Sequence, residues 1–320
     1  MPDAIDKNTS RNFELAKAVA ILLVFTGHFG TGIGFFWVAV SIGLFVFGFS
    51  SAYFTSAKYH DSFRFGPFWE RKLHRLVPDL LVINAFLLVL FIVQQRPGIW
   101  TWQTLVNVLG LNGFLNWFGL GNPSPFGRGL WFFTLLLLFY CAYPILRRVG
   151  RSRAALGITA GAALMVALLL NRYATMGHAL WLTAWSFVFG VFVQRTGVRV
   201  RPVLGAIAAG LLAAVMLGLN MAFDVGVLNP CLIIAISVCA VLSLKDARLP
   251  IRVLNPLQWV SGIVIEIYFL HPYLYLRVTG YRSLDYLASL ACVLAVAWLL
   301  NRAARPIRGG LRGYLHSAQA

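Results

Sequence analysis

Ten apolar runs, each long enough to cross the hydrocarbon core of a bilayer, constrain this sequence more than any other feature. A membrane-spanning helix needs about 20 mostly apolar residues. The runs cover residues 13–30, 35–56, 76–95, 129–147, 154–171, 178–194, 202–220, 225–244, 256–276 and 283–302. We therefore expect an all-α polytopic membrane protein with about ten transmembrane helices.

The composition agrees with that class and argues against a soluble domain. Charged residues make up 12% of the chain and hydrophobic residues 59%, whereas a soluble domain carries roughly 25% charged residues. The four cysteines fall inside apolar runs and form no Cys-x-x-Cys motif or Cys/His cluster. We therefore expect neither a metal site nor a disulfide framework.

The positions of Lys and Arg predict the orientation of the chain. Cytoplasmic connections of membrane proteins carry an excess of both residues. With the N-terminus inside, 21 of the 27 basic residues fall in the inner connections and the two terminal segments, and only five fall outside. We therefore expect both termini in the cytoplasm. The basic residues behind the net charge of +17 then orient the spans in the membrane and contact anionic lipids. We therefore expect membrane lipids and no nucleic acid as partners.

The segment 100–120 is apolar, but asparagines and glycines interrupt it, and its tryptophans suit a membrane–water interface. Irregular backbone at membrane depth is tolerated only inside protein or along a wet cavity. We expect a re-entrant or interfacial element here. Because no long polar stretch separates the runs, residues 1–320 are expected to form a single transmembrane domain.

Ionisable groups inside spans are costly and therefore mark functional candidates. The first run holds Lys17 and His28. Eleven residues turn a helix by three full turns plus roughly 20° and advance it by about 16 Å, so the two side chains share one face. Glu14 lies one turn before Lys17, where it can pair with the amine. A membrane anchor at Lys17 and an interfacial histidine at His28 are the alternative interpretations.

The run 256–276 carries Glu266 and His271, and Pro272 is expected to kink it. His271 lies at about the depth of His28, so the two histidines predict a polar pocket in the outer half of the bundle. For Glu266, the alternative interpretation is a pairing with a basic group on a neighbouring span. Before the third run, Arg71, Lys72 and Arg75 form either a positive-inside cluster or a phosphate-binding patch.

These stretches, in this order, resemble the membrane acyltransferase-3 family. The matching stretches are Glu14 with Lys17 and His28, residues 43–54, Arg71 with Arg75 and Pro78, Trp131 to Phe133 with Pro144, and "VIEIYFLHP" at 264–272. The sequence departs from the family pattern at Lys17, where the family has arginine, and at Val264-Ile265, where it has Ser-Tyr. A bidentate contact is therefore lost at position 17.

The resemblance implies an O-acyltransferase of the bacterial inner (cytoplasmic) membrane. It would move an acetyl group from cytoplasmic acetyl-CoA to a hydroxyl of an extracytoplasmic or membrane-linked glycan. The catalytic residues it implies are His28 as general base or transient acyl carrier, with Lys17 and His271. Donor contacts would come from Lys17, Arg71, Lys72 and Arg75, and acceptor contacts from Arg128, Trp131, Glu266 and His271.

Several alternatives stay open. A transporter or flippase of lipid-linked sugars would also use ten spans with buried charges, although no repeat symmetry supports it. The acyl group can be acetyl, succinyl or longer, and transfer can be direct or pass through an acyl-histidine. The acceptor and the oligomeric state are not readable from the residues.

Overall fold

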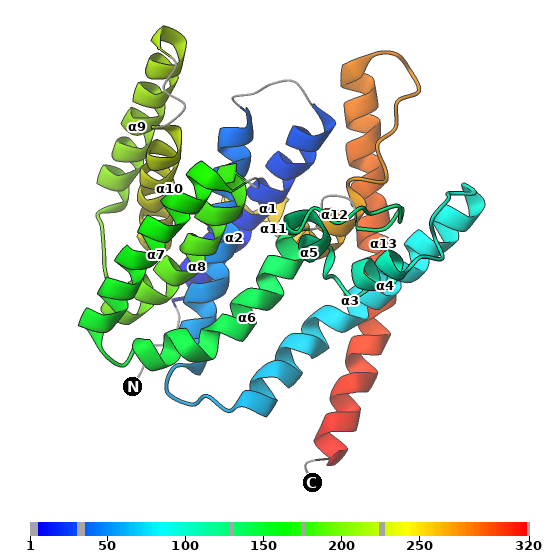
Figure 1. Cartoon of the computed structure of the whole chain (residues 1–320), viewed down its shortest axis with the longest axis horizontal. Helices are drawn as coiled ribbons and strands as arrows, with labels where there is room; N and C mark the ends of the chain where they lie inside the picture. Colours follow the sequence, from blue (N-terminus) through cyan, green and yellow to red (C-terminus); the bar gives the residue numbers. More distant parts are fainter. Residues whose placement is uncertain (1–5, 31–35, 128–130, 175–176, 224–227, 319–320) are drawn as a thin grey trace. The chain divides into compact units, whose positions relative to one another are not determined.

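The computed structural model describes the backbone of residues 6–30, 36–127, 131–174, 177–223 and 228–318, and their side chains except 177–179, 251–254, 256 and 311–318. All regular secondary structure in this described part is helical, and it contains no strand (Figure 1). The helices are α1 (Lys7–Phe29), α2 (Phe36–Tyr59), α3 (Phe65–Val93), α4 (Trp102–Val108), α5 (Asn112–Trp117), α6 (Trp131–Val149), α7 (Arg153–Tyr173), α8 (Gly177–Thr196), α9 (Pro202–Ala222), α10 (Asn229–Asp246), α11 (Ile251–Ser261), α12 (Val264–Leu270) and α13 (Arg282–Ala318).

Eight helices in the described part are long and apolar enough to cross a membrane: α1, α2, α3, α6, α7, α9, α10 and α13. They coincide with eight of the ten expected spans and confirm the all-α membrane class. Helix α8 covers the expected run 178–194 but is not among the eight. The orientation of the termini stays a prediction.

The expected continuous span over 256–276 is wrong. The chain leaves the helix at Gly262 and Ile263, which separates α11 from α12, and α12 ends at Leu270 instead of kinking at Pro272. Pro272 has no N–H to bond the carbonyl of Tyr268, four residues earlier. The Nδ1 atom of His271 lies 2.7 Å from that carbonyl oxygen. The ring therefore takes the place of the missing amide, and the helix stops.

A second difference concerns the third span, which starts eleven residues earlier than expected. Helix α3 begins at Phe65, so the basic residues expected in an inner loop lie on its first turns. Pro78 is tolerated inside this helix. In the segment 100–120, α4 and α5 are 7 and 6 residues long, too short to cross a bilayer. This agrees with a segment that does not span, and its place in the membrane stays a prediction.

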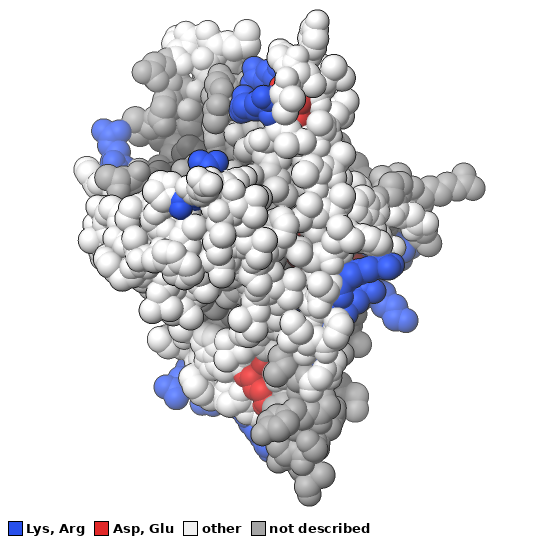
Figure 2. All heavy atoms as spheres, turned by 90° about the vertical axis from the view of Figure 1, so that its right-hand side faces the viewer, with Lys and Arg blue, Asp and Glu red and all other residues white. Residues whose placement is uncertain are grey.

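The chain divides into two compact units, and each is described by itself. Unit 1 comprises residues 1–62 and 138–261, and unit 2 comprises residues 63–137 and 262–320. On the face drawn in Figure 2, basic side chains gather in small separate patches, and uncharged surface lies between them. Such a pattern is typical of a chain whose charges are confined to the ends of its spans.

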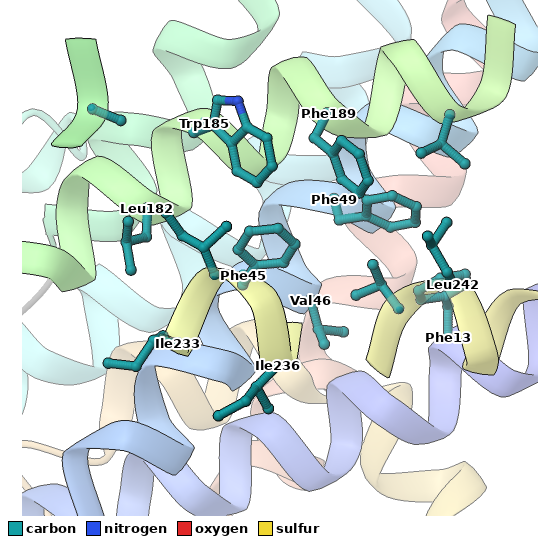
Figure 3. Close-up of a cluster of buried hydrophobic side chains, with 14 of the residues drawn as sticks. Phe13, Phe45, Val46, Phe49, Leu182, Trp185, Phe189, Ile233, Ile236 and Leu242 are labelled. Carbon is teal, nitrogen blue, oxygen red and sulfur yellow. The ribbon is translucent and has the colours of Figure 1, made fainter. Parts of the chain in front are cut away.

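Unit 1 is built around α2, which packs against α1, α8 and α10. Its core is aromatic: the rings of Trp185 and Phe189 stack at 4.9 Å and face Phe45 and Phe49 of α2 (Figure 3). Glycine lets α2 and α8 approach closely, because a Cβ at Gly190 would meet the backbone of Phe49. Small residues of this kind allow membrane helices to pack without a hydrophobic driving force.

The start of α1 is fastened to the end of α10 within unit 1. Thr9 donates its hydroxyl to the carbonyl of Lys245 at 2.8 Å. Asn12 donates its amide to the carbonyls of Leu244 and Ala247 at 2.9 and 2.7 Å. These side chains satisfy carbonyls that the end of a helix leaves without partners, so they fix where the two helix ends lie.

Unit 2 is built around α3 and α13, with α12 packed against both. A network of buried polar side chains holds its long connection between α3 and α6. Asn107 donates to the carbonyl of Phe126 at 3.0 Å, and Thr134 donates to the carbonyl of Gly110 at 2.8 Å. The connection is thus an ordered part of this unit.

Candidate functional site

In unit 1, the candidate residues lie along α1, which is one uninterrupted helix from Lys7 to Phe29. This continuity is the condition for Lys17 and His28 to share a face. Both side chains are half-buried. The imidazole of His28 meets the ring of Trp37 on α2 edge to face, with centroids 5.2 Å apart and planes at 89°. The contact restricts the orientation of the imidazole at the end of the helix.

Glu14 has a local partner on the same helix. Its Oε1 accepts a hydrogen bond from the hydroxyl of Ser10 at 3.4 Å, and the side chain is half-buried. The bond is long and links residues one turn apart, so it contributes little to stability. The expected pairing of Glu14 with Lys17 stays a prediction.

In unit 2, Glu266 on α12 is held by α13. The carboxylate is 2% exposed, and its Oε1 accepts from the side-chain amide of Asn301 at 2.6 Å. Asn301 also donates to the carbonyl of Gly262 at 3.2 Å, at the break before α12. A buried carboxylate needs such donors. Glu266 therefore contributes to docking α12 on α13, and its expected role in acceptor binding stays a prediction.

His271 is fully buried, directly after α12. A carbonyl oxygen only accepts, so its 2.7 Å contact with the carbonyl of Tyr268 places a proton on Nδ1 and leaves Nε2 as the basic nitrogen of the neutral ring. The hydroxyl of Tyr268 accepts from the backbone N–H of Phe132 at 3.0 Å. This bond brings the neighbourhood of His271 and the start of α6, where Trp131 lies half-buried, together in unit 2.

The basic cluster lies on the first turns of α3. Arg71 and Arg75 are exposed and one turn apart, as their spacing predicts. The ammonium of Lys72 lies 5.4 Å from the centroid of the Phe68 ring, a cation–π distance. Arg128 lies outside the described residues. Lys17, His28 and Glu14 thus belong to unit 1, whereas the remaining described candidates belong to unit 2.

The sequence did not reveal an ion pair between α3 and α13, the two helices against which α12 packs. Asp79 on α3 is 5% exposed, and its carboxylate lies 3.0 Å from a guanidinium nitrogen of Arg308 on α13. Arg308 also donates to the carbonyl of Asn301 at 3.0 Å. A carboxylate just inside the third apolar run was the available signal, because such a residue is rare without a partner. The partner itself, more than two hundred residues away, left no signal.

The helices and their polar side chains define a class: an integral membrane protein with multiple candidate spans, some of which carry ionisable side chains such as Lys17 on α1 and Asp79 on α3. Within the described residues, no group of three or more His, Cys, Asp or Glu side chains could hold a metal ion.

The sequence profile of the acyltransferase-3 family, an acyltransferase domain, matches residues 10–302, and the chain belongs to this family. It is therefore an integral membrane acyltransferase. No curated protein and no solved structure was found to match the chain. The family match includes every candidate site residue, from Glu14 to His271, and it confirms the resemblance that the sequence motifs indicated.

Proposed function

We propose that the protein is an O-acetyltransferase of the bacterial cytoplasmic membrane, which moves acetyl from cytoplasmic acetyl-CoA to a hydroxyl of an extracytoplasmic or membrane-linked glycan. One observation carries the proposal beyond family membership. Lys17 and His28 lie on one face of the uninterrupted helix α1, both half-buried. About 16 Å separates them along the axis at 1.5 Å per residue, a length that the pantetheine arm of CoA can span.

In the proposed reaction, His28 is the general base. Its imidazole takes the proton of the acceptor hydroxyl while that oxygen attacks the thioester carbonyl. The tetrahedral oxyanion then collapses, the carbon–sulfur bond breaks, and the imidazolium returns the proton to the leaving thiolate. The edge contact with Trp37 supports this role because it holds the ring in one orientation. In the alternative, a relay, a ring nitrogen of His28 attacks the thioester carbonyl, the carbon–sulfur bond breaks and CoA leaves as the thiol. The acceptor hydroxyl then attacks the acetyl-imidazole, the carbon–nitrogen bond breaks, and the ring nitrogen takes the proton of the hydroxyl.

His271 is proposed to orient the acceptor. Because Nδ1 is engaged with the carbonyl of Tyr268, the neutral ring offers Nε2 as an acceptor for a sugar hydroxyl. Trp131, half-buried at the start of α6, is proposed to stack on the apolar face of the sugar ring, and Arg128 and Glu266 are kept as proposed acceptor contacts. Lys17, Arg71, Lys72 and Arg75 are proposed to contact the anionic donor.

Transfer of labelled acetyl tests the function. Purified protein is mixed with acetyl-CoA carrying radiolabelled acetyl and with oligosaccharide acceptors, and the label in the saccharide is measured together with free CoA. We expect both to appear at equal rates. A flippase would instead move a fluorescent lipid-linked sugar across proteoliposome membranes without consuming acetyl-CoA. That result, with no label transferred to any saccharide, would contradict the proposal, whereas family membership supports the enzyme.

A further inference from the structure

A cavity of about 980 Å³ lies at one end of unit 1. Its wall consists of residues at the starts of α1 and α7, residues at the ends of α2, α8 and α10, and the segment after α8. All of its lining residues belong to unit 1. Ligand cavities typically measure roughly 300–1,000 Å³, so this one can hold a molecule as large as a nucleotide.

Basic side chains outnumber acidic ones six to three in the wall of this cavity. The basic residues are Arg153, Arg195, Arg199, Arg201, Lys245 and Arg248. Of the acids, Asp246 is engaged by Lys245, whose ammonium lies 2.8 Å from its carboxylate. Among the described residues, the four exposed arginines at positions 153, 199, 201 and 248 form no ion pair with a carboxylate. Their guanidinium groups are therefore available to an anion.

Topology alone explains part of this charge, because helix C-termini and cytoplasmic connections both favour cations. It does not explain why basic residues from three separate segments surround one cavity.

Hydrogen bonds between side chains and neighbouring elements hold the wall of this cavity in place. Thr9 donates to the carbonyl of Lys245 at 2.8 Å, and Ser56 donates to the side-chain oxygen of Gln194 at 2.7 Å. The second bond leaves the amide N–H groups of Gln194 for another acceptor.

We propose that this cavity binds the phosphate-bearing nucleotide end of the acyl-CoA donor, an inference that rests on the proposed function. That end of CoA carries a diphosphate, a 3′-phosphate and a flat base. Guanidinium groups bind phosphate through paired hydrogen bonds. Tyr53, Val193 and Val200 add apolar and aromatic surface to the same wall, which suits a base. An anionic lipid headgroup shares the phosphate chemistry but lacks the base.

Binding of CoA to the purified full-length protein tests the inference. We compare wild type, Arg199→Ala/Arg201→Ala, and the control Arg148→Ala/Arg151→Ala, which removes the same charge from exposed residues outside the cavity. Isothermal titration uses three probes: CoA, dephospho-CoA without the 3′-phosphate, and pantetheine without any phosphate. Because hydrogen bonds to charged groups are strong, we expect CoA affinity to fall roughly tenfold or more in the cavity variant. Pantetheine binding and the control variant should not change.

The outcomes separate this inference from the proposed function. If wild type turns over acetyl-CoA and the cavity variant binds CoA as tightly as wild type, the cavity inference is wrong and the function stands. If wild type binds no CoA, both are wrong. Native mass spectrometry adds a test of lipid: loss of retained phosphatidylglycerol from the cavity variant, with unchanged CoA affinity, would identify a lipid site and overturn the inference. Thermal unfolding of each variant confirms that it is folded.

Discussion

At the scale of single residues, α1 carries a cation, Lys17, and a base, His28. A helix that faces only lipid needs neither side chain. Both side chains are half-buried and lie on one face of a continuous helix, and a partner ring from α2 restricts the imidazole. Compared with the arginine of the family pattern, Lys17 keeps the positive charge but presents a compact ammonium group instead of a planar guanidinium group. The proposed role of Lys17 is therefore electrostatic attraction of the donor without a bidentate contact.

Substitution of Lys17 tests that role. Lys17→Met keeps the length and apolar stem of the side chain but removes the charge, so we expect the KM for acetyl-CoA to rise roughly tenfold, the size of one charge-assisted interaction. Lys17→Arg keeps the charge and should retain wild-type KM within about threefold. Steady-state kinetics with acetyl-CoA measures both. Equal KM values for Lys17→Met and wild type would show that the amine is only a membrane anchor.

At the scale of elements, the long spans could be predicted because length and hydropathy alone define a membrane helix. The break of 256–276 at Gly262 and Ile263 could not, nor could the end of α12 at Leu270, where a side chain, His271, replaces a backbone donor for the carbonyl of Tyr268. The pair of Asp79 with Arg308 depends on which helices become neighbours. For the same reason, the sequence did not reveal the cavity among the helix ends of unit 1, and the donor contacts expected on α3 stay a prediction.

Close packing of α2 on α8 makes Gly190 intolerant of a side chain. An added Cβ would meet the backbone of Phe49 and the methyl group of Ala52, neither of which can rotate away. We expect Gly190→Ala to lower the free energy of unfolding by about 1–3 kcal/mol, the range for an overpacked core. The control Gly161→Ala on α7 meets no atom within 4 Å, so it should be neutral or stabilise by up to about 1 kcal/mol. Thermal unfolding in detergent compares them, and equal midpoints would contradict the packing argument.

At the scale of the whole molecule, each compact unit draws on two segments that are far apart in the chain, and the family match covers both units. The candidates for proton transfer on α1 lie in unit 1, and the proposed acceptor contacts lie in unit 2. The proposed function requires a defined orientation of the chain in the membrane, because CoA is cytoplasmic and the proposed acceptor is not. That orientation is predicted from the positions of Lys and Arg.

Cysteine labelling tests that orientation. In a variant without the four native cysteines, Ser62→Cys lies between α2 and α3, and Gln95→Cys lies after α3. The positive-inside distribution predicts that a membrane-impermeant maleimide labels Gln95→Cys in intact spheroplasts and labels Ser62→Cys only after lysis. The reverse pattern would place the basic ends of the helices outside and would contradict a cytoplasmic donor.

Single-turnover transfer by His28→Ala shows whether His28 carries the proton in acetyl transfer. His60→Ala is the matched control: burial, with Arg195 close by, lowers the pKa of His60, so its loss removes no charge at pH 7. We predict that His28→Ala, folded and still binding CoA, transfers labelled acetyl at least about 100-fold more slowly than wild type, whereas His60→Ala keeps the wild-type rate. Transfer at the wild-type rate by folded His28→Ala would contradict the account.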